Sequence, residues 1–306
     1  MEHSPTVLMR EADPVRPLAA SRQVVLTRIA HASVLLDFGG TRILTDPWFS
    51  ERWGYYHGEP YGIRLEDLPH LDGVLVSHDH YDHYDMAAFR AYPDKAVPMI
   101  VKRGTAHVAR AVGFTRVTEL DPWETAQLGP LTVTATPAKH KVPENTYILQ
   151  GRSHTVYFGA DTLLIPGLRT IAPRFPRIDL ALLAINGLRL RPLLNRQVVM
   201  GPQDAAELCA LLRPRVVVPI HYTFTGGPLR DRLLIKVAGT PQQVLDAFTQ
   251  AVARCAPQTV VRVLTPGQPL QVRDAIGDGS GPHPATPPSG VAWHTPGRAE
   301  GQVRPC

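Results

Sequence analysis

Short runs of apolar and β-branched residues alternate with turn-forming residues through the first half of the chain and predict β-strands. Runs at 24–29, 33–38 and 41–46 open the pattern, and the Gly39-Gly40 pair between the second and third indicates a hairpin turn. In the run at 131–138, Thr132, Thr134 and Thr136 fall on one face and Val133 and Ala135 on the other, which is typical of a half-buried strand. The other strands expected in this half are 73–77, 98–102, 147–150 and 155–161.

Helical patterns and apolar runs alternate in the second half. A helix is predicted at 202–214, with proline near its start and at its end, and another at 240–255, with Thr240 as N-cap and Pro241 as the first helical residue. Short helices are expected at 86–92 and after Gly104, and strands at 179–185, 215–221 and, as the last of the fold, 260–264. This order of elements favours a layered α/β architecture.

Composition limits the size and location of this fold. The chain has 306 residues, 44% of them hydrophobic and 19% charged, which is typical of a globular protein with a sizeable core. We interpret residues 1–22 as an N-terminal leader, 23–272 as one domain and 273–306, rich in Gly, Pro, Ser and Ala, as a disordered tail. Neither a membrane-spanning run nor a signal-peptide core is evident, so we expect a cytoplasmic protein without stable membrane association.

Charge and cysteine content narrow the choice of partners. The formal net charge is +5, and Lys and Arg are not gathered in a block, so we expect no nucleic-acid partner. The three cysteines, Cys209, Cys255 and Cys306, are not spaced for a disulfide framework or a zinc ribbon. A small-molecule substrate is the expected partner, and an anionic one if basic residues line the cleft. The oligomeric state does not follow from the sequence.

The densest group of chemically active residues is the segment HDHYDH at 78–83. It follows the apolar run at 73–77 and supplies His78, His80, Asp82 and His83. Imidazole nitrogen and carboxylate oxygen are the ligands that zinc and related ions prefer. A loop that leaves a strand can direct side chains at this spacing into one place. The segment therefore predicts a metal site, and a histidine-rich surface loop is the weaker interpretation.

HDHYDH also matches the HxHxDH signature of the metallo-β-lactamase superfamily. The surrounding sequence resembles this family over roughly residues 24–265, and the segments ATPAKH, YFGADT and VVVPIHY resemble its later motifs in the same order. The segment HASVLLDFGGTRILTDPWFS at 31–50 resembles the branch that contains ascorbate-phosphate lactonases and N-acyl-phosphatidylethanolamine phospholipases D. A complete and ordered set of motifs is far more specific than HxHxDH alone.

The resemblance implies a four-layer αββα sandwich with two divalent metal ions at one edge. Zinc is the favoured metal, with manganese or iron as alternatives. One ion would be held by His78, His80 and His140, the second by Asp82, His83 and His221, with Asp161 as the bridge. Taken singly, the three outlying residues of this set have ordinary structural interpretations, but together, each at the end of a strand run, they favour the metal site.

The reaction implied by the resemblance is cleavage of an ester-type bond by a metal-bound hydroxide, with a phosphodiester or a lactone as the favoured substrate. Asp82 and His221 are the expected catalytic residues, Asp82 as a proton acceptor. Two other classes remain open: an iron-dependent oxidoreductase with the same ligands, and a non-catalytic biosynthetic accessory protein. The intact ligand set argues against the accessory protein.

Further residues near these motifs have a structural and a functional interpretation. Asp46 is expected to hold the metal loop or a ligand histidine in place, and Asp85 to cap the helix at 86–92. For His31 a structural hydrogen bond is at least as good an explanation as a role in the site, and Tyr222 is expected to be packed.

Two groups of residues have evenly balanced interpretations. Arg189, Arg191 and Arg196 form either an anion-binding loop or a solvated one. An aromatic group forms either a pocket wall or a local core; it comprises Trp48, Phe49, Trp53, Tyr55 and Tyr56.

Overall fold

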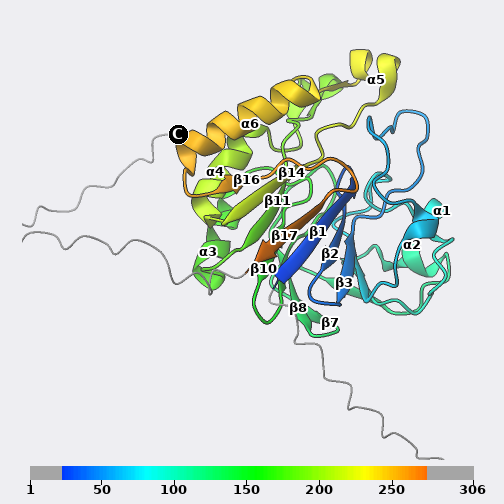
Figure 1. The fold of residues 1–306 in the computed structure, drawn as a ribbon. Helices are drawn as coiled ribbons and strands as arrows, with labels where there is room; N and C mark the ends of the chain where they lie inside the picture. Colours follow the sequence, from blue (N-terminus) through cyan, green and yellow to red (C-terminus); the bar gives the residue numbers. More distant parts are fainter. Residues whose placement is uncertain (1–22, 274–306) are drawn as a thin grey trace, which may run out of the picture.

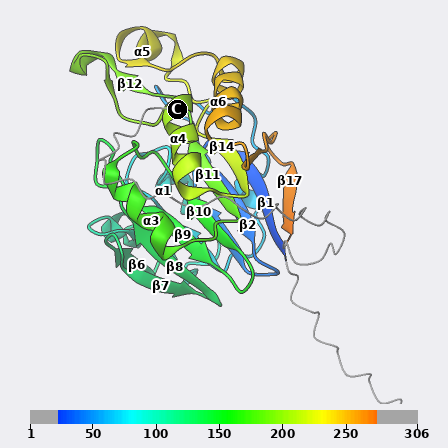
Figure 2. The same ribbon diagram turned by 90° about the vertical axis from the view of Figure 1, so that its left-hand side faces the viewer.

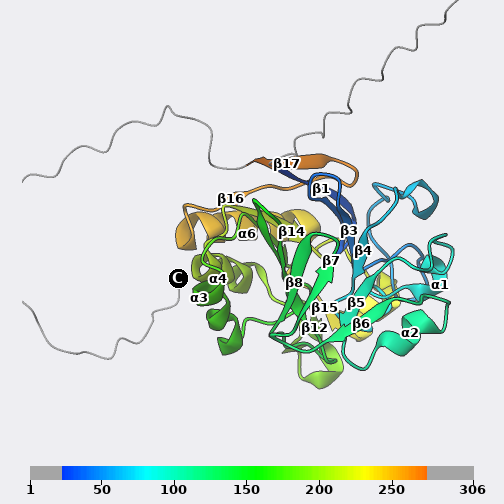
Figure 3. The same cartoon turned by 90° about the horizontal axis from the view of Figure 1, so that it is seen from below.

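Two seven-stranded β-sheets lie face to face, and helices cover the outer side of each sheet (Figures 1 and 3). This computed structural model describes residues 23–273; the predicted leader at 1–22 and residues 274–306 of the predicted tail lie outside the described residues. The order of layers is helix, sheet, sheet, helix, which confirms the predicted αββα sandwich. Within residues 23–273, no helix has the length and apolar character needed to cross a bilayer.

The first sheet has an antiparallel part and a parallel part. Its strand order is β17-β1-β2-β3-β4-β5-β6, antiparallel from β17 to β3 and parallel from β3 to β6. Gly39 and Gly40 make the predicted turn between β2 and β3, with φ of 66° and 103° that favour glycine. The strands are β1 Gln23–Ala30, β2 Ser33–Asp37, β3 Arg42–Thr45, β4 Gly73–Leu75, β5 Met99–Lys102, β6 Val117–Leu120 and β17 Pro269–Arg273.

The second sheet has the same mixed construction. Its order is β16-β14-β11-β10-β9-β8-β7, antiparallel from β7 to β10 and parallel from β10 to β16. Because β10, β11 and β14 run parallel, their carboxyl ends meet at one edge of the sheet. The strands are β7 Thr125–Leu128, β8 Leu131–Thr136, β9 Thr146–Gln150, β10 Thr155–Phe158, β11 Leu180–Ala184, β14 Val216–Ile220 and β16 Val260–Val261.

Helices pack on the outer faces and at one end of the sandwich. The first sheet is covered by α1 Met86–Phe89 and α2 Ala106–Arg110, and the second by α3 Ile171–Arg174, α4 Pro202–Leu212 and α6 Pro241–Cys255. At one end, α5 Gly227–Leu233 lies beside a small sheet of β12 Arg189–Leu190, β13 Arg196–Gln197 and β15 Ile235–Lys236 (Figure 2). Single 3₁₀ turns occur at Leu65–Asp67, Pro166–Thr170 and Arg191–Leu193.

The central strands β11 and β14 of the second sheet are buried on both faces, which explains their continuous apolar runs. In β11, Leu180 and Leu182 point into the core between the sheets, whereas Ala181 and Leu183 point into the core beneath α4 and α6. The period of two along the strand thus serves two separate cores. A third core lies between the first sheet and the helices α1 and α2.

Helix α6 confirms the sequence prediction in detail. It begins at Pro241, and the Thr240 hydroxyl accepts a hydrogen bond from the Gln243 amide at 3.3 Å. Helix α4 also begins at the predicted Pro202, but it ends at Leu212 and is followed by a left-handed residue, Arg213.

Other expectations for the elements were wrong. The strand β8 is not half-buried, because Thr134 and Thr136 are both buried. The Thr136 hydroxyl forms a hydrogen bond with the Thr146 hydroxyl at 2.6 Å, and this bond satisfies both polar groups inside the protein. The strand at 260–264 is neither as long as expected nor the last, because β17 returns to the first sheet and pairs with β1. Arg273, assigned to the tail, is the last residue of β17.

A buried ion pair joins β1 to the loop that precedes the 3₁₀ turn at 65–67. The Arg28 guanidinium, 1% exposed, donates to both carboxylate oxygens of Glu59 at 2.5 and 2.6 Å and to the Leu264 carbonyl. Glu59 also accepts a hydrogen bond from the backbone amide of His31. Such a buried pair is costly to break, because the remaining charge has no partner.

We predict that Glu59→Ala lowers the free energy of unfolding by about 3–5 kcal/mol, because it leaves the Arg28 charge buried and unpaired. Urea unfolding measures the change. Glu66→Ala is the control, because Glu66 pairs with Arg64 on the exposed surface and should have no measurable effect. Equal unfolding midpoints for the two variants would contradict the assigned importance of the buried pair.

Candidate metal centre

The residues of the predicted metal site lie in loops that follow strands of both sheets. The metal loop, residues 76–85, follows β4; His140 comes after β8, Asp161 after β10 and His221 directly after β14. The carboxyl ends of parallel strands provide one edge where such side chains can meet. All seven predicted ligands are brought together there, in two adjoining groups that share Asp161.

The first group contains His78, His80 and His140. The His80 Nδ1 atom lies 2.9 Å from His78 Nε2 and 3.1 Å from His140 Nε2, so three ring nitrogens converge on one place. Burial, together with the neighbouring His140, lowers the pKa of His80 to about 4, and burial also lowers the pKa of the other two rings. The three rings are therefore uncharged near neutral pH, as metal binding requires.

The far sides of two of these rings are held by other groups. His140 Nδ1 lies 2.7 Å from the Val198 carbonyl, which can only accept a hydrogen bond, so His140 Nδ1 carries the proton and Nε2 presents a lone pair. His78 Nδ1 lies 2.8 Å from the Ser77 hydroxyl and 3.4 Å from the Glu144 carboxyl group. These contacts direct both Nε2 atoms towards the centre of the group.

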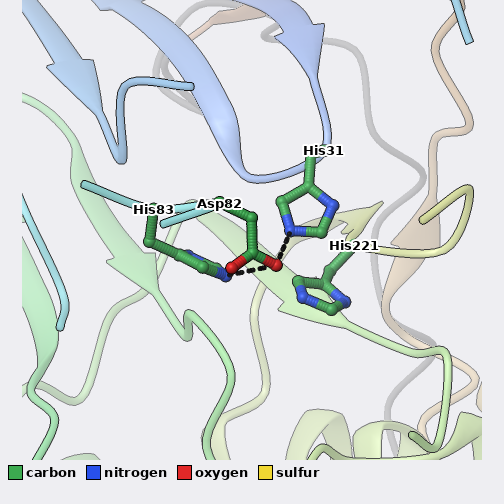
Figure 4. Close-up of side chains that lie close together, drawn as sticks. All are labelled: His31, Asp82, His83 and His221. Atoms are coloured by element: carbon green, nitrogen blue, oxygen red, sulfur yellow. Dashed lines mark ion pairs between the residues drawn. The ribbon is translucent and has the colours of Figure 1, made fainter. Parts of the chain in front are cut away.

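The second group contains Asp82, His83 and His221, and His31 joins it (Figure 4). One donor atom from each of the four residues lies within 4.8 Å of the others. His31 and His83 lower the pKa of Asp82 below its usual value although burial alone would raise it, so the carboxylate is ionised at neutral pH. Three imidazoles and an ionised carboxylate thus face one another.

Asp161 lies between the two groups. Its Oδ2 atom is 3.0 Å from His221 Nε2, 3.3 Å from His83 Nε2 and 4.0 Å from His140 Nε2. Burial would raise the pKa of this carboxyl group, but His221 and His83 hold it well below the usual range. Its Oδ1 atom is buried and has no hydrogen-bond partner among the described residues. A buried carboxylate oxygen without a partner is costly in the metal-free protein and fits a cation at this position.

Asp46 confirms its predicted role as a support for the metal loop. Its carboxylate accepts hydrogen bonds from the Ser77 amide and the Ser77 hydroxyl, each at 2.7 Å, and lies 2.6 Å from His83 Nδ1. The His83 ring is thereby oriented with Nε2 towards Asp161. Asp85 confirms its prediction too, because it caps α1 through the Ala88 amide at 3.0 Å.

His31 belongs to the site more closely than the sequence indicated. It is fully buried, its Nε2 lies 3.4 Å from Asp82 Oδ2, and its ring packs on that of His221 with centroids 3.9 Å apart. Its Nδ1 has no hydrogen-bond partner among the described residues. Its Nε2 has none either, so the side chain does not make the structural hydrogen bond that was one interpretation of the sequence. The ring instead contacts Asp82 and His221 of the second group.

Four of the eight non-glycine residues with left-handed backbone among the described residues lie at the same place. His31, Asp46, Ala160 and His221 all have left-handed φ angles, between 35° and 55°, although none is glycine. Each such residue costs free energy that the surrounding structure must offset, and strain of this kind is typical of functional sites. Two of the four, His31 and His221, belong to the second group, and Ala160 directly precedes Asp161.

A pocket opens above the two groups, with His80, Asp82, His140, Asp161 and His221 among its lining residues. Its apolar wall comprises Tyr55, Leu188, Leu190, Val198, Phe224 and Ile235. Lys141 and Arg230 also line it and bring positive charge next to the metal groups. The pocket therefore suits a molecule with an anionic group and an apolar part.

The three arginines of the second half have different environments. Arg189 donates to the Asn195 carbonyl and to Gln197, and Arg191 donates to the carbonyls of Asp231 and Ile235, so both stabilise the small sheet. Arg196 alone of the three lines a hollow, together with Lys139, Lys141 and Leu193.

The aromatic group after Asp46 is also divided. Trp48 is fully buried and stacks on His57, whereas Tyr55 lines the pocket and Trp53 is 71% exposed. Phe49 stacks on Phe89, Tyr56 bridges to Thr225, and Tyr222 is packed in the core as expected.

Two residues that the sequence did not indicate hold the ligands by hydrogen bonds from outside the metal groups. Asn186 Nδ2 lies 2.9 Å from His221 Nδ1, and Glu144 accepts the Asp161 amide at 2.8 Å. Burial and the charge of Asp161 raise the pKa of Glu144 well above its usual value, so Glu144 is neutral beside the ionised Asp161. Asn186 had a usable signal, because it follows the apolar run at 179–185 as the ligands follow theirs. Glu144 had none.

Known proteins match this chain over most of the described residues. A family model for β-lactamase superfamily domains matches residues 41–222. A Mycobacterium tuberculosis protein of uncharacterized function is 32% identical over 248 residues, which cover 72% of this chain and 66% of the relative. A metal-dependent hydrolase of Caldivirga maquilingensis is 27% identical over 80% of this chain and 96% of its own length. An N-acyl-phosphatidylethanolamine-hydrolyzing phospholipase D of Caenorhabditis elegans is 28% identical over a match that covers 64% of this chain and 63% of the relative.

Solved structures show the same fold. A metallo hydrolase from Ignicoccus hospitalis has a TM-score of 0.61 and 25% identity, covering 81% of this chain and 98% of its own. A diiron β-hydroxylase from Streptomyces venezuelae has a TM-score of 0.64 and 19% identity, and the match covers 83% of this chain and 54% of the hydroxylase. At 19% identity, the similarity to the β-hydroxylase shows a shared fold alone.

We predict that His31→Asn weakens the binding of a divalent metal by about 10–100-fold, because Asp82 and His221 lose the ring that restrains them. Asparagine tolerates the left-handed backbone of this position. Competition with a chromophoric chelator measures the affinity. His107→Asn, an exposed histidine on α2, is the matched control. Unchanged affinity in His31→Asn would show that the ring has no part in the site.

Proposed function

Because this chain belongs to the metallo-β-lactamase superfamily, we propose that it is a metal-dependent hydrolase of ester-type bonds, with a phosphodiester or a lactone as substrate. The observation that carries the proposal is Asp161, a buried carboxylate between two groups of metal-type ligands at the base of an open pocket. The curated relatives named as hydrolases support the reaction class.

We further infer two divalent ions, with zinc favoured. His78, His80 and His140 would hold one ion, Asp82, His83 and His221 the other, and Asp161 both. When bound, such ions supply an acidic water molecule and polarise the ester oxygen. The donor set supports zinc, because it consists of imidazole nitrogens and carboxylate oxygens.

The protein side chains have separate tasks around the reacting bond. Lys141 and Arg230 orient an anionic group of the substrate, and the apolar wall excludes water from it. Asp82 is the proposed proton acceptor, because its carboxylate is ionised and lines the pocket. His221 forms the base of the pocket beside it and is fixed by Asn186.

Iron chemistry is the alternative that the same donors support, since imidazole and carboxylate also bind iron. A visible absorption spectrum of the purified protein separates the two proposals, because zinc is colourless and iron in such a site absorbs. The accessory-protein alternative predicts no turnover with any metal.

We predict that the zinc-loaded protein hydrolyses bis(p-nitrophenyl) phosphate or a small lactone, that chelator treatment abolishes the activity and that zinc restores it. Asp161→Asn should lower kcat/KM by at least about 100-fold, because it removes the bridging charge. Asp246→Asn, on the exposed side of α6, is the matched control and should keep the wild-type rate.

Retention of activity in Asp161→Asn would contradict the proposed site. Turnover that depends on iron and a reductant, without hydrolysis of either substrate, would replace the hydrolase by the oxidoreductase.

A further inference from the structure

The pocket that opens above the metal groups is bordered by an unusual apolar surface. Among residues 23–273, six of the eight exposed large hydrophobic side chains lie on the three segments 51–57, 188–198 and 226–236. We call these segments the pocket rim. The six side chains are Trp53, Leu193, Leu194, Leu229, Leu233 and Leu234, with Leu194 96% exposed. Exposed apolar groups gathered around a pocket mark a binding surface more often than scattered ones do.

The inner sides of the same segments wall the pocket, and the segments are held to one another. Arg230 donates a hydrogen bond to the Gly54 carbonyl, and the Arg191 amide donates to the Leu234 carbonyl at 2.9 Å. In the small sheet Leu190 pairs with Ile235, and both line the pocket. Figure 2 shows β12 and α5 side by side at this end of the molecule. The rim is therefore one continuous surface around the entrance.

The pocket rim is also strongly basic. It contains seven Lys or Arg residues against two acidic ones. Within the described part of the chain, none of the seven forms an ion pair with a carboxylate; Arg189, Arg191 and Arg230 donate to neutral oxygens instead. A hollow of about 410 Å³ beside the pocket adds Lys139 and Lys141 to Arg196, and shares His140, Lys141 and Val198 with the pocket. Positive charge therefore continues from the rim to the metal groups.

Exposed leucines interspersed with uncompensated arginines fit a surface that is both apolar and anionic. A second copy of this chain does not fit, because a two-fold contact would place the same positive charges against each other. Nucleic acid would favour stacking aromatic groups over leucine side chains. A lipid surface with anionic head groups offers acyl chains to the leucines and negative charge to the arginines.

We propose that the pocket rim docks the protein reversibly on an anionic lipid surface. Leu193 and Leu194, between β12 and β13, and the exposed leucines of α5 insert between lipid tails, and the arginines bind head groups around the entrance. This docking does not depend on the proposed hydrolase function.

The test compares binding of the zinc-loaded full chain to vesicles of equal parts phosphatidylglycerol and phosphatidylcholine with binding to pure phosphatidylcholine, by co-sedimentation. We predict at least about tenfold tighter binding to the mixed vesicles and weakening by salt. Leu194→Ser/Leu229→Ser/Leu233→Ser should bind the mixed vesicles at least about tenfold more weakly. The control Val260→Ser/Val263→Ser changes the other two exposed hydrophobic residues, outside the rim, and should bind like the wild type.

The lipid-binding proposal is overturned if the wild type does not bind the mixed vesicles, or if the leucine variant binds them as well as the wild type does. A wild-type dimer that the leucine variant loses would assign the rim to a second copy and also overturn it. None of the substituted leucines lines the pocket, so hydrolysis of bis(p-nitrophenyl) phosphate should be unchanged in both variants. Vesicle binding without any hydrolysis would leave the docking intact and defeat the proposed function.

Discussion

The buried carboxylate of Asp46 is the contact on which the metal centre depends. It lies at the end of β3 and bonds the Ser77 amide, the Ser77 hydroxyl and the His83 ring, so it fixes where the metal loop leaves β4 and how one ligand is oriented. A buried charge requires such partners, because burial without them costs several kcal/mol. The hydrogen bonds that offset the cost of burying Asp46 thus also position the metal loop and its ligands.

Around this contact, the molecule combines a part with buried cores and a part built from short elements. The ligands follow strands of two sheets whose cores are fully packed, and strained backbone at His31 and His221 is held by that packing. The pocket rim is built from two-residue strands and a short helix instead. In the proposed function, the sandwich would carry the chemistry, and the smaller appended surface would contact the substrate. This division is typical of folds that support many reactions.

The fold was predictable where periodicity and motifs act locally. The capped helix α6, the glycine hairpin after β2 and the ordered ligand motifs needed only neighbouring residues. The burial of Thr136 was not predictable, because its hydroxyl is satisfied by Thr146 on another strand. His31 and Glu144 were underestimated or missed for the same reason: their partners, Asp82 and Asp161, lie far away in the sequence. The pocket rim, too, exists only once its three segments are assembled.

The most direct test of this account is the metal content of protein purified without added metal, measured by elemental mass spectrometry beside a His80→Ala/Asp161→Ala variant. Two adjoining ligand groups that share Asp161 predict about two divalent ions per chain, lost in the variant. Absence of stoichiometric metal, even after reconstitution with zinc, manganese or iron, would contradict the account and leave the buried histidines without a function.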